Sequence, residues 1–301
     1  MRKLLILAIV GLAAQLVDGS LGMAYGVTST TLLVLAGIAP AFASASVHLA
    51  EVGTTLVSGL SHWKLGNVSW SAVGWLAVPG AVGAFCGAVV LSSVSAEAAK
   101  PWVALFLFLL GIYILIRFAF LGQSTPQIKK KLTPKFLVPL GALAGFLDAA
   151  GGGGWGPIST PTILASGRLD PRRTVGTVDT SEFLVAIAAS AGFLVSLDRS
   201  QIALQLVLAL LIGGMIAAPI AAWLVRKMHP RVLGSAVGGL ILLTNARTLL
   251  TSLDASQSIA ATAYGVIGVV WVAACVTAFV ASRQESGERR VEISREYEYS
   301  S

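Results

Sequence analysis

Among the 301 residues of this chain, the acidic residues inside apolar stretches are the most suited to chemistry. Asp18 and Asp148 each precede a glycine-containing turn in otherwise apolar surroundings. An ionisable group at membrane depth is costly, so it commonly marks a proton relay or a cation site. We expect Asp18 and Asp148 either to hold a coupling H⁺ or Na⁺, or to accept hydrogen bonds from the turn and fix its shape.

A second acidic pair, Glu51 and Glu182, lies on the helices expected to follow the two turns. Polar residues around each Glu recur at helical spacing, and such a face should turn toward protein or water rather than lipid. The first face consists of His48, Glu51, Thr55, Ser58 and His62, and the second of Thr177, Asp179 and Glu182. These acids are expected to relay protons or to form structural hydrogen bonds. His48 is expected either to take part in gating or simply to satisfy a packing need.

Two matching stretches predict breaks in helices. Residues 148–160, DAAGGGGWGPIST, contain four consecutive glycines, and residues 18–30, DGSLGMAYGVTST, match them position for position with fewer glycines. Glycine continues a helix poorly because it loses much backbone entropy on ordering. Unpaired backbone at membrane depth is tolerated only where it is buried in protein or lines a cavity. We therefore place the functional site at these two stretches.

The second arm of each broken helix is expected to begin near Gly26 or Gly156, and Pro157 suits a first helical turn. Helix N-termini present free N–H groups and a positive dipole, so two facing ends could hold an anion without a buried cation. The hydroxyl groups could donate as well, or could bond back to carbonyls one turn earlier. The expected substrate-binding residues are Gly22, Tyr25, Gly26, Ser29, Thr30, Gly152, Gly153, Gly154, Trp155, Gly156, Ser159 and Thr160.

Arg247 is the remaining candidate for gating, near the outer end of an apolar span. It could counter an anion on the exit path. The alternative is a side chain that extends to the membrane interface.

The composition predicts a polytopic helical membrane protein, because 55% of the residues are apolar, 12% are charged, and apolar runs of membrane-spanning length recur. The net charge of +7 lies mainly in short loops, where it reports orientation and could attract cytoplasmic anions. It is not interpreted as a nucleic-acid site. Cys86 and Cys275 are far apart in apolar segments, so neither a disulfide framework nor a thiolate metal site is indicated. We expect no cofactor and no metal.

The expected fold is all-α, with two inverted repeats, each a Gly-rich broken helix or re-entrant hairpin plus three spans, and one extra C-terminal span. The expected helical segments are 4–17, 27–38, 40–61, 70–91 and 101–121, then 135–147, 158–166, 172–196, 201–225 and 232–252, and finally 259–281. The corresponding parts of the chain are a first repeat (1–121), a basic cytoplasmic linker (122–134), a second repeat (135–252), an additional span (253–281) and a disordered cytoplasmic tail (282–301).

Basic residues favour hairpins over interrupted spans at the two breaks. With hairpins, the halves are inverted and nearly all loop cations face the cytoplasm, although Arg2 and Lys3 remain outside. With spanning breaks, the clusters at 168–173 and 226–231 would lie opposite residues 129–131. The cations concerned are Lys64, Arg117, Lys129, Lys130, Lys131, Lys135, Arg168, Arg172, Arg173, Arg226, Lys227 and Arg231. Inverted repeats with discontinuous helices are a recurrent plan of secondary transporters.

The N-terminus, MRKLLILAIVGLAAQ, has the features of a signal peptide. We expect it to be retained, because cleavage would remove the first element of the repeat. The predicted location is a bacterial inner membrane, crossed several times, with a small anion and the lipid bilayer as partners. A homodimer is one assembly to consider.

The chain resembles the TauE/SafE family of sulfite and organosulfonate exporters. The features that carry the resemblance are a broken first helix with a Gly-rich turn, a similar one opening the second half, and a Pro after a short second arm. The resemblance covers residues 4–252. It implies export of a small sulfur-containing oxyanion, whereas composition and spacing alone imply only transport.

The leading hypothesis is therefore a secondary transporter that works by alternating access, coupled to H⁺ or Na⁺. An anion channel and, less favoured, a polytopic membrane enzyme are the alternatives. The chain contains no G-x-S-x-G or H-E-x-x-H motif and only three histidines, so we expect no enzyme and no catalytic residues. It also lacks a Walker-type phosphate loop, which argues against ATP-driven pumping.

Overall fold

The protein is represented by a computed structural model that describes residues 2–21, 23–121, 132–169, 171–198, 200, 202, 204–224 and 230–300. All regular structure in these ranges is helical, which confirms the predicted helical class. Gly22, most of the linker, Lys129, Lys130, Lys131, Arg226 and Lys227 lie outside the described residues.

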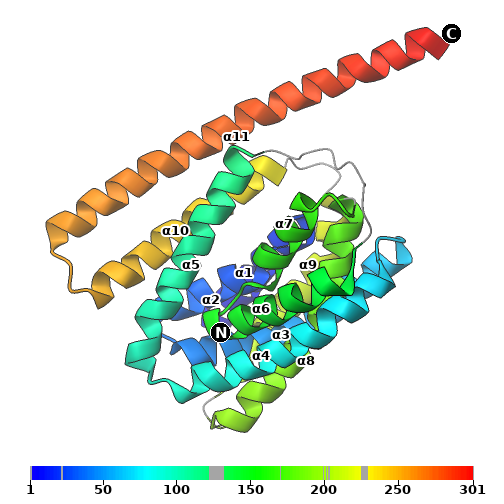
Figure 1. The fold of residues 1–301 in the computed structure, drawn as a ribbon. Coiled ribbons are helices and arrows are strands. Elements are labelled where there is room, and N and C mark those ends of the chain that lie inside the picture. Colours follow the sequence, from blue (N-terminus) through cyan, green and yellow to red (C-terminus); the bar gives the residue numbers. More distant parts are fainter. Residues whose placement is uncertain are drawn as a thin grey trace.

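Among the described residues, five helices form the first half of the chain and five the second, and one more follows (Figure 1). The first half comprises α1 (Arg2–Leu21), α2 (Tyr25–Leu35), α3 (Pro40–Lys64), α4 (Trp70–Ser93) and α5 (Ala96–Ala119). The second half comprises α6 (Pro134–Gly151), α7 (Trp155–Ala165), α8 (Pro171–Ser196), α9 (Leu204–Leu224) and α10 (Pro230–Ser252), and α11 (Gln257–Ser300) follows. The predicted segments match these helices in order.

Among the described residues, four helical segments are long and apolar enough to cross a membrane: Trp70–Ser93, Ala96–Ala119, Arg172–Ser196 and Gln257–Gln284. Together with the other apolar helices they make the chain a multi-pass membrane protein. Although α3 has 25 residues, it falls outside this set because it carries the polar face predicted from the sequence.

Both predicted helix breaks are present. In the second half, Gly152 and Gly153 separate α6 from α7 with φ values of 78° and 137°, a backbone region that side chains rarely adopt. In the first half, Ala24 occupies the corresponding region with φ 119° without being a glycine. Nine of the 11 residues of α2 are buried, so these short helices lie inside the bundle.

The two halves interlock through reciprocal contacts. Helix α4 packs against α6 and α8, while α9 packs against α1 and α3. Helices α3 and α8 contact each other, as do α5 and α10 (Figure 1). The α4–α6 and α4–α8 pairs thus have counterparts in the α9–α1 and α9–α3 pairs.

Several helix ends are joined by specific contacts. The guanidinium of Arg168, after α7, lies 4.8 Å from the ring centre of Phe136 at the start of α6. The Ser69 amide, before α4, donates to Thr177 Oγ1 near the start of α8 at 3.0 Å. Arg231 donates to the Ala119 carbonyl at 3.4 Å, joining the start of α10 to the end of α5. The end of α7 therefore lies beside the start of α6.

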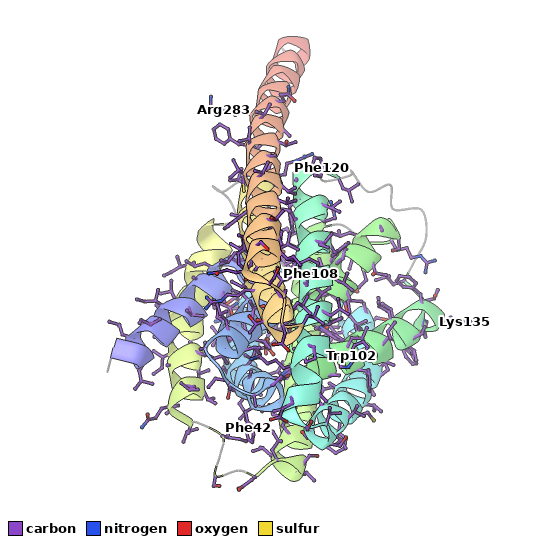
Figure 2. All side chains as sticks on the ribbon, turned by 90° about the vertical axis from the view of Figure 1, so that its left-hand side faces the viewer. Phe42, Trp102, Phe108, Phe120, Lys135 and Arg283 are labelled. Carbon is purple, nitrogen blue, oxygen red and sulfur yellow. The ribbon has the colours of Figure 1, made fainter. Side chains whose placement is uncertain are left out.

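Helix α11 continues to Ser300, over the residues that the sequence predicted as a disordered tail. Arg and Glu are good helix formers, and extension of an existing helix avoids the cost of nucleation. Helix α11 packs against α10 and α5 and extends beyond the other helices (Figures 1 and 2). Phe108 and Trp271 belong to the apolar cluster at this contact.

The close approach of α4 and α6 predicts intolerance to side chains at Gly83, where a Cβ would collide with the Ala142 carbonyl. We expect Gly83→Val to lower the midpoint of thermal unfolding in detergent by roughly 5–10 °C, because overpacking of this kind costs about 1–3 kcal/mol. Gly74→Val on the same helix is the matched control, since a Cβ there meets nothing within 4 Å. Equal losses in the two variants would contradict this packing.

Candidate functional site

Asp148 caps the N-terminus of α7. Its Oδ1 accepts hydrogen bonds from the backbone amides of Gly154 at 2.7 Å and Trp155 at 3.0 Å. These amides belong to the group of N–H donors that every helix N-terminus leaves unpaired. The carboxylate therefore holds the second break in shape, which was one of the two roles expected for it.

The other oxygen of Asp148 joins this cap to α3. Oδ2 lies 3.1 Å from His48 Nε2, and His48 Nδ1 donates to the Ser44 carbonyl at 2.8 Å. A carbonyl can only accept, so Nδ1 carries a hydrogen. A hydrogen bond between Nε2 and the carboxyl then requires one further proton, on the imidazole or on Asp148. Glu51 Oε2 lies 3.9 Å from the same nitrogen, which completes a buried His48–Glu51–Asp148 cluster.

Asp18 occupies the equivalent position at the first break. Its Oδ1 accepts a longer hydrogen bond, 3.4 Å, from the Tyr25 amide at the start of α2. Its carboxylate meets those of Asp179 and Glu182 on α8, with ligand oxygens all within 4.8 Å of one another. Asp179 Oδ2 also lies 3.7 Å from His62 Nε2. Three buried carboxylates thus share one small volume.

The two clusters correspond to one another across the halves. In each cluster the acid before a break meets the helix that follows the other break. The shared numbering offset pairs Glu51 with Glu182 and His48 with Asp179. The fold is therefore matched, but a histidine in one cluster is replaced by an acid in the other.

The two broken tips are in contact. A Cβ placed on Gly26 would lie 3.1 Å from both Gly153 Cα and Glu51 Oε1. Gly152 lies against the side chain of Thr30. These glycines permit the two helix starts to approach so closely, and Gly156 is buried in the first turn of α7.

Three hydroxyl groups near the tips have no hydrogen-bond partner among the described residues. They are the buried Oγ atoms of Ser29 and Ser159 and the buried Oγ1 of Thr30. Thr160 is buried beside Ser159. Free hydroxyls at this position are available to a ligand.

Tyr25 and Trp155 anchor the tips. The Tyr25 hydroxyl donates to the Leu210 carbonyl on α9 at 3.2 Å, and the Trp155 indole N–H donates to the Val178 carbonyl on α8 at 3.0 Å. Their side-chain donors are engaged by protein, so these two residues position the tips rather than offer free donors.

No Lys or Arg is among the buried side chains of the residues that the structure describes. Arg247 lies on the exposed side of α10, away from the buried tips. Any anion at the tips would depend on backbone amides, hydroxyls and helix dipoles.

Sequence reasoning missed two polar residues at the site. Ser44 Oγ donates to the Ala149 carbonyl at 2.9 Å, and Asn245 Nδ2 donates to Thr31 Oγ1 at 2.9 Å. Asn245 gave a usable signal as an amide inside an apolar span. Ser44 gave none, because small hydroxyl residues are common in membrane helices.

Comparison with known proteins gives a consistent result. Residues 7–248 match the family model described as Sulfite exporter TauE/SafE. The chain is 54% identical over 286 residues to the "Probable membrane transporter protein YtnM" of Bacillus subtilis (strain 168), covering 94% of each chain. It is 29% identical over 212 residues to the "Probable membrane transporter protein YdhB" of the same organism, covering 68% of this chain and 84% of the relative. No solved structure matches.

The unequal caps predict unequal effects of removing the two aspartates. Asp148→Ala should lower the free energy of unfolding by about 2–4 kcal/mol, because it leaves two amides and His48 without their partner. Asp18→Ala should cost less than about 1 kcal/mol, since it loses one long hydrogen bond and relieves a crowded group of acids. Unfolding of both variants in one detergent checks this. Equal losses in the free energy of unfolding would contradict this prediction, because they would show that the two aspartates contribute equally to stability.

Proposed function

Since the chain belongs to the sulfite exporter TauE/SafE family, we propose that it exports a small sulfur-containing oxyanion, sulfite or a small organosulfonate, as a secondary transporter of a bacterial inner membrane. The family and its relatives make it a membrane transporter. Their names point to a transporter rather than an enzyme. The substrate, the coupling and the mechanism are the proposed parts.

The observation that carries this proposal is the meeting of two helix N-termini inside the protein. Gly26 at the start of α2 contacts Gly153 before α7, and buried hydroxyls without partners follow in both helices. Two helix dipoles then point their positive ends at one place. Small oxyanions such as sulfite accept hydrogen bonds on every side, which suits a site built of amides and hydroxyls.

The reciprocal packing supports two related repeats, α1 to α5 and α6 to α10. The α4–α6 and α4–α8 contacts have the α9–α1 and α9–α3 contacts as counterparts. The paired α3–α8 and α5–α10 contacts would lie across the axis relating the repeats. This is the arrangement from which alternating access can arise by movement of one repeat against the other.

The contact of Arg168 with Phe136 supports a re-entrant hairpin in the second half. Were α6 and α7 one interrupted span, their 18 and 11 residues would place these ends roughly 40 Å apart. In the hairpin, α7 returns to the side from which α6 enters. We propose the same arrangement for α1 and α2.

The joined helix ends also support a cytoplasmic basic face. The pairs Phe136–Arg168, Ser69–Thr177 and Ala119–Arg231 bring together helix ends next to Lys135, Lys64, Arg172 and Arg117. The positive-inside rule then orients this face toward the cytoplasm. Anions leaving the cell would meet it first.

Transport of labelled sulfite into and out of liposomes containing the purified protein tests the function. We expect saturable flux above that of empty liposomes, with competition by small sulfonates. Flux at the background level for sulfite, sulfonates and related oxyanions would overturn the proposal. Single-channel currents insensitive to ion gradients would instead indicate a channel.

The tip contact predicts that Gly153→Ala reduces sulfite flux at least tenfold. A Cβ there would collide with the backbone of Gly26 and Val27, and the φ of 137° opposes any side chain. Gly66→Ala is the matched control, because Gly66 also has a positive φ, 71°, but a Cβ there meets nothing within 4 Å. We expect less than a twofold loss for this control at equal protein per vesicle. Similar losses in both variants would mean that the tips play no special part.

A further inference from the structure

The two buried acid clusters differ in the ring-bearing residue that lies beside each of them near a helix end. His62, in the last turn of α3, lies with Nε2 3.7 Å from Asp179 Oδ2. The position equivalent to His62 in the second half is Phe193, by the same offset that relates Glu51 to Glu182. Phe193 is fully buried and its ring lies 5.9 Å from that of His48. One cluster is therefore faced by an imidazole and the other by a phenyl ring.

His62 also connects with the end of its helix. The His62 side chain is 11% exposed, and its Nδ1 lies 3.4 Å from the side-chain Nδ2 of Asn67 in the following loop. Lys64 and the loop residues around it are exposed. His62 thus lies between the exposed end of α3 and the buried acids, with Nε2 facing Asp179 and Nδ1 facing the buried side chain of Asn67.

On the Nε2 side, His62 faces the three buried acids. Asp179 is 3% exposed, and its Oδ2 has no hydrogen-bond partner among the described residues. Asp18 and Glu182 have oxygens within 4.8 Å of the Asp179 carboxylate. Three carboxylates at this separation cannot all be ionised without a compensating positive charge.

We propose that Asp18, Asp179 and Glu182 hold the coupling proton of transport and that His62 carries this proton to and from the cytoplasmic face. The proposal rests on the proposed function and on the orientation given above. The titratable groups facing this proton are Asp18 from α1, His62 and Glu51 from α3, Asp148 from α6, and Asp179 and Glu182 from α8. His62 is here a proton-transfer residue and does not bind the oxyanion.

Imidazolium His62 gives the hydrogen on Nε2 to Asp179 Oδ2 and becomes neutral. The ring keeps its Nδ1 hydrogen, so the next proton, from water at the end of α3, returns to Nε2. The reverse order returns the proton to the cytoplasm. At 3.7 Å, a small side-chain movement or one water closes the gap. Phe193 can do none of this, so the cluster around His48 has no such connection.

The experiment separates net transport from exchange. Liposomes containing the full chain and pyranine report proton movement during net flux of labelled sulfite driven by a pH gradient. Exchange of labelled for unlabelled sulfite at equal pH requires no net proton movement. We expect His62→Gln to reduce proton-coupled net flux at least tenfold and exchange less than threefold. His62→Phe, which copies Phe193, should behave like His62→Gln.

A second variant tests the acid cluster itself. Asp179→Asn fixes the neutral form, so we expect exchange to continue while net flux loses its response to the pH gradient. Glu97→Gln is the matched control, because Glu97 is exposed in the first turn of α5. It should leave both readouts within twofold of the unchanged protein. Gel filtration in detergent confirms that each variant is folded.

Three outcomes would overturn the inference while leaving sulfite transport intact. The first is sulfite flux that is not accompanied by a pyranine response. The second is a pH-gradient response that is unchanged in both His62 variants. The third is a flux that a sodium gradient alone can drive. Absence of sulfite flux and exchange in the unchanged protein would instead reject the proposed function.

Discussion

The structure depends on how it satisfies backbone amides at two helix breaks inside an apolar bundle. Each unpaired amide at membrane depth is costly, and a carboxylate accepts especially strong hydrogen bonds from such amides. Asp148 supplies one with two short hydrogen bonds, and its second oxygen then requires His48. A local need for capping thereby determines where α6 must meet α3, and brings an imidazole and Glu51 to the tips.

The two helix breaks carry unequal chemistry. At the second break the cap consists of two short hydrogen bonds, and Asp148 also faces His48, whose ring lies beside that of Phe193. At the first break the cap is a single hydrogen bond of 3.4 Å, Ala24 takes a strained backbone conformation, and Asp179 occupies the position that corresponds to His48. The cluster at the first break is therefore more weakly capped and holds three acids close together, which suits a group that changes its protonation during a cycle.

The sequence predicted the breaks because glycine and a preceding acid act locally, within residues 18–30 and 148–160. It predicted the order of the helices for the same reason. It did not reveal which acid meets which helix, since the contact of Asp148 with His48 joins residues 100 apart and crosses the halves. The roles of Ser44 and His62 likewise follow from packing. For residues 282–300, composition indicates solvation but not whether the preceding helix continues through them.

Magnitudes decide how an anion could bind beside so many acids. A helix terminus favours an anion by roughly 0.3–2 kcal/mol, so two facing termini contribute a few kcal/mol at most. An ionised Glu51 about 5 Å from the anion would repel it by about 3 kcal/mol at an effective dielectric constant near 20. Because Glu51 Oε1 lies against Gly26, its repulsion of the anion nearly cancels the attraction by the two helix termini. Oxyanion binding at the tips therefore requires the neighbouring acids to be neutralised first, which links the anion to a proton or cation by electrostatics alone.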